Sequence, residues 1–138
     1  MNLDIALEEL LPHPVEAVWS ALTEAEAISD WLMATGDFLP QVGARFRLKR
    51  LSPDGWIHAE VLEFEPPRRM VWSWSVDDAG PSTTVTFELT PEGDSTRLAL
   101  THVGEIDPLV GNLFEQGWPG RIELLRTTLA QRHDGGDQ

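Results

Sequence analysis

The hydrophobic pattern changes its period three times along the chain, and these changes are what most constrain the fold. Between residues 43 and 103, apolar side chains recur at every second position, as in the run from Thr84 to Leu89. A period of two indicates strands that bury one face. Clusters of proline, glycine and acidic residues interrupt the alternation at turn-like intervals. We therefore predict an antiparallel meander of five strands, with turns at 53–55, 66–67, 78–81 and 91–94.

One segment of the meander departs from strict alternation. Ile57, Ala59 and Val61 share one face of the expected strand, whereas Leu62 and Phe64 fall on the other face. A β-bulge produces such a change because it adds one residue to one strand of a pair. We predict a bulge within residues 56–64.

A further alternating segment and two helical segments precede the meander. Apolar residues alternate over residues 2–10, which predicts a further strand that ends at Pro12-His13-Pro14. Residues 15–22 then show helical spacing, and Pro14 suits the first position of a helix. Thr23-Glu24-Ala25-Glu26 has the pattern of a capping box. It predicts a second short helix that carries Trp31.

After Pro108 the period returns to that of a helix. Gly117, Pro119 and Gly120 predict that this helix is kinked or divided in two, because proline removes an amide donor and clashes with the preceding turn. Residues 134–138 lack apolar anchors, so we predict one domain over residues 1–133 followed by a disordered tail. The apolar stripe of the helix consists of Val110, Phe114, Trp118, Ile122, Leu125 and Leu129.

Composition excludes several classes of partner and chemistry. The chain carries 23 acidic and ten basic side chains, a formal charge of −13, and such a surface repels phosphate backbones and anionic headgroups. We expect neither nucleic acid nor a membrane as a partner. The chain has no cysteine, which excludes disulfides and thiolate chemistry. An acidic N-terminal segment and the absence of a long apolar run predict a soluble, cytoplasmic protein; the oligomeric state stays open.

The order of strand, two short helices, five-strand meander and long helix is that of a helix-grip protein. The motifs themselves resemble the START-like (SRPBCC) superfamily, and within it the branch named for the C-terminal domain of the activator of the heat-shock chaperone ATPase. At Pro119 the chain departs from the family pattern, in which a helix-compatible residue is typical. The motifs that carry the resemblance are residues 18–23, Trp31, residues 42–46, 60–69, 71–74 and 96–102, and Gly117-Trp118.

The resemblance implies an α+β fold. In it, a curved antiparallel six-stranded sheet wraps around a long C-terminal helix, and two short helices lie between strands 1 and 2. It also implies a hydrophobic cavity between the sheet and the long helix.

Large aromatic residues occur on elements from both ends of the chain, so they must converge in space. Such residues either fill a core or line a pocket for an apolar ligand. His102 shares the buried face of its strand with Leu98 and Leu100, and a neutral imidazole there can hydrogen-bond a ligand or act as a base. The alternative is a structural histidine bonded to a neighbouring element. The aromatic candidates are Trp31, Trp72, Trp74, Phe114 and Trp118.

Motifs for other chemistry are absent from the sequence. His13, His58 and His133 have neither ligand spacing nor nearby carboxylates in such spacing, so we expect no metal site. No nucleophile elbow, phosphate-binding loop or dinucleotide fingerprint occurs, so we expect no catalytic nucleophile and no cofactor.

The leading hypothesis is a non-catalytic binding module for a small hydrophobic or aromatic molecule. In this hypothesis the five aromatic candidates form the wall of the cavity and His102 is its polar anchor. One alternative is an adaptor that acts through its surface on a chaperone or another protein. The other is a cyclase-like or aromatase-like enzyme on the same fold, with His102 as the base.

Overall fold

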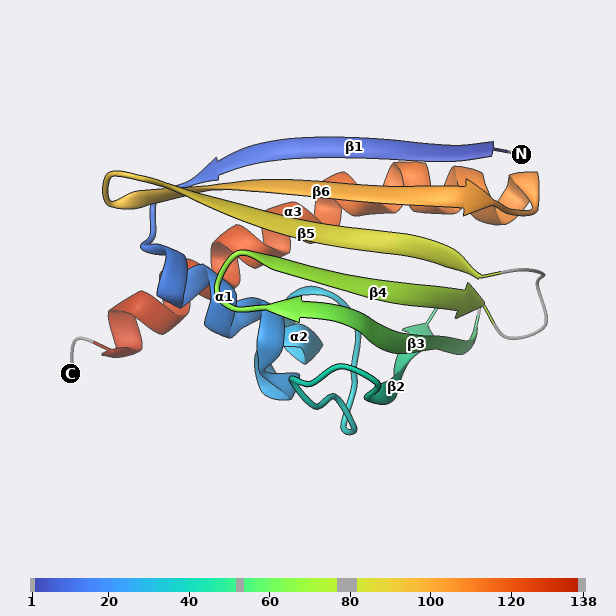
Figure 1. The fold of residues 1–138 in the computed structure, drawn as a ribbon, viewed down its shortest axis with the longest axis horizontal. Coiled ribbons are helices and arrows are strands. Elements are labelled where there is room, and N and C mark those ends of the chain that lie inside the picture. Colours follow the sequence, from blue (N-terminus) through green and yellow to red (C-terminus); the bar gives the residue numbers. More distant parts are fainter. Residues whose placement is uncertain (1, 52–53, 77–81, 137–138) are drawn as a thin grey trace.

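The structure is a computed structural model that describes residues 2–51, 54–76 and 82–136. Figure 1 shows a six-stranded antiparallel sheet with the helices together on one side of it. This arrangement confirms the predicted α+β, helix-grip fold. The elements in chain order are β1 (Asn2–Leu11), α1 (Val15–Thr23), α2 (Ala25–Trp31), β2 (Arg45–Leu51), β3 (Asp54–Glu65), β4 (Arg69–Val76), β5 (Thr83–Glu92), β6 (Ser95–Glu105) and α3 (Pro108–Gly136).

The sheet has the strand order β1-β6-β5-β4-β3-β2. Strands β2 to β6 pair with their neighbours in the chain, as the predicted meander requires. β1 forms one edge of the sheet and pairs with β6, from Asn2 opposite Glu105 to Leu11 opposite Thr96. The turn at 66–67 is where it was predicted. The turn predicted at 91–94 is shorter, because Pro91 and Glu92 still belong to β5. Of the turn predicted at 53–55, residues 54 and 55 belong to β3 and residue 53 lies outside the described residues, as does the whole of 78–81.

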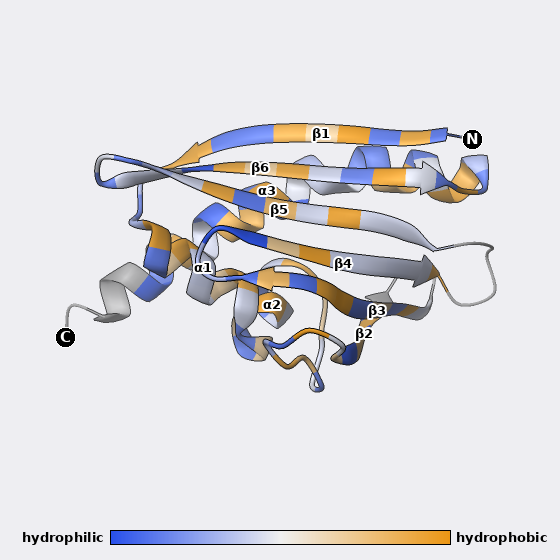
Figure 2. Cartoon of the chain, in the orientation of Figure 1, coloured by the Kyte–Doolittle hydropathy of each residue, from blue (hydrophilic) through white to orange (hydrophobic). Residues whose placement is uncertain are grey.

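The alternation of the strands buries one face of the sheet against the helices (Figure 2). In β5 and β6, for example, Phe87 and Leu100 are each no more than 1% exposed. The part of α3 that follows Trp118, called here its second part, packs into the same core through Ile122, Leu125 and Leu129. The first part runs from Pro108 to Trp118. The predicted apolar stripe is confirmed, and burial of each such side chain contributes about 1.5–3 kcal/mol.

The predicted bulge in β3 is confirmed. Val61 pairs with Trp72 of β4, but the next pair joins Glu63 to Val71. Leu62 is therefore the extra residue, and its side chain is 43% exposed. The bulge explains why the apolar residues of β3 change face at this point.

Helix α3 is not divided in two, so this alternative of the prediction is wrong, and the predicted kink stays a prediction. It runs as one helix from Pro108 to Gly136 with Pro119 inside it. Pro119 and Glu115, whose carbonyl loses its helical donor, are both exposed, so water can satisfy that carbonyl. The helix passes the predicted domain boundary at residue 133 by three residues, and residues 137–138 lie outside the described residues.

The starts of the two short helices also differ in detail from the prediction. Pro14 is the residue before α1 rather than its first residue. The capping box does not form, because Thr23 ends α1 and its hydroxyl donates to the Trp19 carbonyl at 2.8 Å. Glu24 is the cap residue of α2 and makes no side-chain capping bond. The local order of polar residues was read correctly as a helix boundary, but the wrong residue was assigned to the cap.

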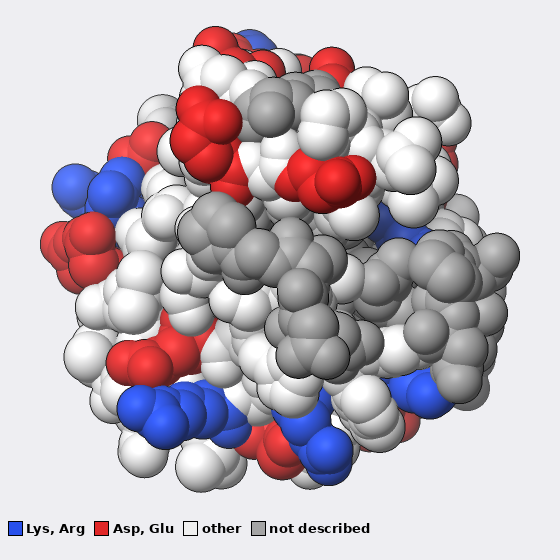
Figure 3. Space-filling view, turned by 90° about the vertical axis from the view of Figure 1, so that its right-hand side faces the viewer, with Lys and Arg blue, Asp and Glu red and all other residues white. Residues whose placement is uncertain are grey.

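Charged side chains of both signs are spread over the surface. Figure 3 shows acidic and basic groups interspersed at the end of the molecule that it faces, rather than one continuous basic area among its described atoms. Among the described residues, no helix combines the length and apolar character that crossing a membrane requires.

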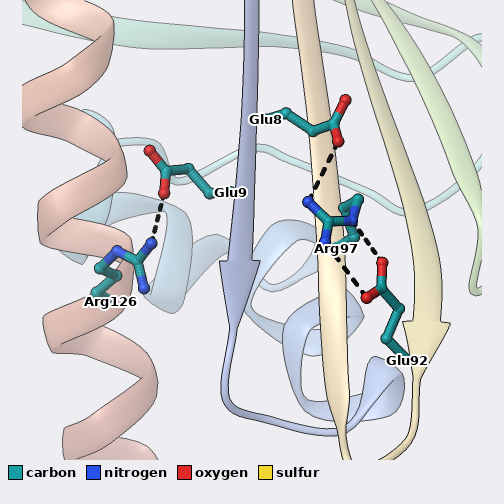
Figure 4. Close-up of polar contacts among 5 residues, drawn as sticks. All are labelled: Glu8, Glu9, Glu92, Arg97 and Arg126. Atoms are coloured by element: carbon teal, nitrogen blue, oxygen red, sulfur yellow. Dashed lines mark hydrogen bonds and ion pairs between the residues drawn. The ribbon is translucent and has the colours of Figure 1, made fainter.

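Several ion pairs connect elements that are distant in sequence (Figure 4). Arg126 of α3 pairs with Glu9 of β1 and also donates to the Leu10 carbonyl at 3.2 Å. Arg97 of β6 lies between Glu8 of β1 and Glu92 of β5. Exposed pairs of this kind contribute little, because water and salt screen them. The Arg126 contacts join α3 to β1, the Arg97 contacts join three strands, and the apolar core supplies most of the stability.

Candidate functional site: a cavity between α2, α3 and the sheet

A cavity of about 470 Å³ lies between the end of α2, the first part of α3 and one end of the sheet. Leu32 and Met33 border it from the residues that follow α2, and Ile57 borders it from β3. Most of this lining is apolar, as is typical of sites for small organic ligands. The cavity lies on the helical side of the sheet, where the resemblance to helix-grip proteins placed it.

Three aromatic residues form the cavity wall, and all three were predicted from the sequence. They are Trp74 of β4 and Phe114 and Trp118 of α3. The Trp74 ring lies 5.8 Å from the Phe114 ring at 90° and 5.7 Å from the Trp118 ring at 46°. These edge and tilted geometries are favourable for aromatic pairs. The contacts hold the wall in place without a ligand.

Trp31 and Trp72, by contrast, lie in the core and do not line the cavity. Both are 0% exposed. The Trp31 indole donates to the Ala21 carbonyl at 2.9 Å, which joins α2 to α1. Trp72 packs against Phe46 and Phe87, with ring centroids 5.0 and 4.8 Å away. The predicted aromatic set is therefore divided between a core cluster and a cavity wall.

His102 lies behind the aromatic wall in a chain of hydrogen bonds. The Trp118 indole donates to His102 Nδ1 at 3.0 Å, and His102 Nε2 lies 2.6 Å from Thr83 Oγ1. Because Nδ1 accepts, the neutral ring carries its proton on Nε2 and donates it to Thr83. Thr83 in turn donates to the Trp74 carbonyl at 3.3 Å. The chain fixes the relative positions of two wall residues, Trp74 and Trp118.

These contacts leave His102 little capacity for the anchor or base role considered from the sequence. The side chain is 0% exposed, and both ring nitrogens have partners within the protein. Burial lowers the pKa of His102 to about 4. A general base needs a nitrogen within reach of its substrate and a pKa near the working pH. The geometry instead matches the alternative of a structural histidine.

Sequence reasoning missed Thr83 and the glycine that lets it approach. Gly104 has φ +141°, and a Cβ there would come within 2.9 Å of Thr83 Cγ2. A glycine at this position therefore gives Thr83 room beside His102. The sequence offered one signal, a glycine two residues after His102.

Three charged residues also border the cavity: Asp30 of α2, Lys49 of β2 and Arg121 of α3. The Lys49 ammonium lies 4.9 Å from the centre of the Trp56 ring, and its amide donates to the Ala34 carbonyl at 2.9 Å. Arg121 is half-buried, and Asp30 is exposed. The sequence signal for Arg121 was its position three residues after Trp118, on the same side of the helix.

Two further features bear on the chemistry of the site. Trp74 Nε1 has no hydrogen-bond partner, but protein atoms cover it, so it is not presented to the cavity as a donor. Within the described part of the chain, no three side chains of the metal-binding types come together. The side chain of His133 lies outside the described residues.

The chain matches a known protein family over most of its length. The family described as "Activator of Hsp90 ATPase homolog 1-like protein" (AHSA1) matches residues 12–130. The chain belongs to this family. The resemblance to the AHSA1 branch of the SRPBCC superfamily is therefore confirmed. No curated protein matches the chain.

Solved AHSA1-like structures share the fold over almost the whole chain. Protein MLL2253 from Mesorhizobium loti is 32% identical, with a TM-score of 0.84, and the match covers 93% of this chain and 97% of that one. CalU16 from Micromonospora echinospora is 26% identical, with a TM-score of 0.78 and 96% and 79% covered. BH1534 from Bacillus halodurans is 26% identical, with a TM-score of 0.77 and 94% and 99% covered.

Proposed function

We propose that this AHSA1 protein binds a small hydrophobic or aromatic molecule in the cavity between α2, α3 and the sheet. The observation that carries the proposal is the cavity itself, about 470 Å³ in volume and walled by Trp74, Phe114 and Trp118. Pockets for small ligands range from about 300 to 1,000 Å³ and are mainly apolar, so both size and lining fit.

The wall of the cavity is held rigid without a ligand, and this rigidity favours ligand binding. Trp74 and Trp118 are 1% and 3% exposed and are fixed through the hydrogen bonds of His102. A preformed wall loses little conformational freedom when a ligand enters, which leaves more of the apolar contact free energy for affinity. No catalytic role is included, because both ring nitrogens of His102, the base considered from the sequence, are bonded within the protein.

The test uses N-phenyl-1-naphthylamine, a neutral aromatic probe whose fluorescence rises in apolar surroundings. We expect saturable binding to the wild-type protein. Gly117 borders the cavity, and a Cβ there would meet no heavy atom within 4 Å, so Gly117→Leu should place a side chain at the cavity and weaken binding at least about tenfold. The thermal unfolding midpoint of Gly117→Leu should not fall, which separates a loss of binding from a loss of the fold.

Gly120 provides the matched control. It lies on the same helix, and a Cβ there also meets nothing within 4 Å, but it does not line the cavity. Gly120→Leu should therefore bind the probe as the wild type does. If the wild-type protein fails to bind the probe, or if the two variants lose it equally, the proposal is wrong.

A second candidate function is an adaptor that binds a chaperone through its surface. It is favoured by exposed apolar side chains beside the β3 bulge, where the Gly43 amide donates to the Val61 carbonyl at 2.8 Å. Val42 and Leu62 are 62% and 43% exposed. Stimulation of purified Hsp90 ATPase, lost in a Val42→Ser/Leu62→Ser variant, would support it. No stimulation at saturating concentration would exclude this function.

A further inference from the structure

Among the arginines with described side chains, Arg121 combines two properties that no other one combines. It is half-buried, and its guanidinium has no hydrogen-bond acceptor among the described residues. It makes no hydrogen bond or ion pair with any described residue. Arg68 is also unpaired, but it is exposed to solvent. The arginines that do form ion pairs are Arg45, Arg47, Arg69, Arg97, Arg126 and Arg132.

An unpaired guanidinium at an apolar cavity is costly. Partial removal of a charge from water raises its free energy unless an acceptor replaces the lost water. The chain has 23 acidic residues to supply such an acceptor, and it does so for six other arginines. Arg121 is therefore the group at the cavity whose hydrogen-bonding capacity is left for a molecule from outside.

The other charges at the cavity do not take this role. The Lys49 ammonium is drawn to the Trp56 ring, where Arg47 also lies 4.3 Å from the ring centre. Asp30 is exposed and forms no ion pair with Arg121, although both residues border the cavity. An anion at Arg121 therefore replaces water and does not have to displace a carboxylate of the protein.

We propose that the natural ligand of the cavity is an amphipathic anion: an aromatic or aliphatic body with one carboxylate or similar acid group that pairs with Arg121. The body packs on Trp74, Phe114 and Trp118, and the acid group accepts from the guanidinium. Arginine suits this role because its planar fork can donate two parallel hydrogen bonds to one carboxylate. The inference rests on the proposed binding function and adds the charge of the ligand to it.

The test compares two probes that differ by one acid group. N-phenyl-1-naphthylamine is neutral, and 8-anilinonaphthalene-1-sulfonate has the same aromatic body with a sulfonate. In Arg121→Gln, the dissociation constant of the sulfonate probe should rise at least about tenfold, the scale of a lost charge-assisted hydrogen bond, while that of the neutral probe should change less than about twofold. Arg121→Lys should recover part of the lost affinity.

Arg68→Gln is the control, because it changes the net charge by the same amount at an exposed position away from the cavity. It should leave both dissociation constants unchanged. Equal effects of Arg121→Gln and Arg68→Gln on the sulfonate probe would overturn the inference, as would an equal loss of both probes in Arg121→Gln. If the wild-type protein binds neither probe, the proposed binding function itself fails.

Discussion

The two parts of α3 show how one amphipathic helix serves two purposes. In the second part, Leu125 and Leu129 are 0% and 2% exposed, and Arg126 pairs with Glu9 of β1. In the first part, Val110 and Phe114 lie on the same apolar stripe but are only half-buried. The same helical period thus leads to a closed core at one end and to an incompletely filled space at the other. The difference teaches that the cavity results from what covers the helix, not from its own pattern.

Trp118 marks the boundary between these two parts. It is 3% exposed and its indole is bonded to His102, so it belongs to the packed region. Its ring also faces the cavity with Phe114, which is only half-buried. A residue that is fixed by a hydrogen bond to the protein and borders the cavity can contact a ligand without losing its position.

The largest expected effect is a loss of stability in the second part of α3. Leu125→Ala should lower the free energy of unfolding by about 2–5 kcal/mol, because it leaves a cavity in a closed core. Chemical denaturation followed by tryptophan fluorescence measures the change. Leu113→Ala is the matched substitution in the first part and should cost less than about 1 kcal/mol, since Leu113 is already 47% exposed. Equal losses would contradict the division of the helix.

A second test addresses His102 of β6, which accepts a hydrogen bond from Trp118 at the boundary between the two parts of α3. His102 has a pKa of about 4 in the folded protein because of burial, against about 6.5 when unfolded. The unfolded state therefore binds a proton first, and the free energy of unfolding should fall by up to about 3 kcal/mol as the pH drops from 6.5 to 4. Above pH 6.5 this contribution is complete and constant.

The control for this pH dependence is His102→Gln, because other groups also titrate in acid. The difference in unfolding free energy between wild type and variant should shrink between pH 6.5 and 4 and stay constant above that range. A difference that does not vary with pH would show that His102 titrates in the folded protein as it does when unfolded.

The fold was largely predictable from the sequence because periodicity reports directly which face is buried. The six strands, α1, α3 and a bulge in β3 followed from it, whereas α2 was predicted from a capping box that does not form. Three of the five aromatic candidates, Trp74, Phe114 and Trp118, line the cavity. Periodicity could not separate these from Trp72, because positions 72 and 74 lie on the same face of β4 and differ only in what packs over them.

The polar part of the site was less accessible to sequence reasoning. His102 was correctly placed on the buried face, but its partners Thr83 and Trp118 come from other elements, and only the packed structure shows that they occupy both nitrogens. Arg121 is not part of the predicted apolar stripe of the long helix. Whether such a residue has an acceptor depends on the other elements that surround it.

A smaller effect should distinguish the glycines near the boundary. Gly117 and Gly120 are both helical, and a Cβ at either would meet no heavy atom within 4 Å. Gly117→Ala and Gly120→Ala should each raise the free energy of unfolding by about 0.5–1 kcal/mol, because alanine loses less backbone freedom on folding. A stabilisation at Gly120 alone would indicate that the first part of α3 needs a glycine for its shape.

The smallest expected effects compare the two arginines on either side of Ile122. Arg126 donates to the Leu10 carbonyl and pairs with Glu9, so Arg126→Gln should lower the free energy of unfolding by up to about 1 kcal/mol. Arg121 has no acceptor among the described residues, so Arg121→Gln should be neutral or slightly stabilising. Denaturation at low and high salt measures both, because screening should weaken only the Arg126 effect. A loss of more than about 1 kcal/mol in Arg121→Gln would mean that this guanidinium is already satisfied within the protein, as that of Arg126 is.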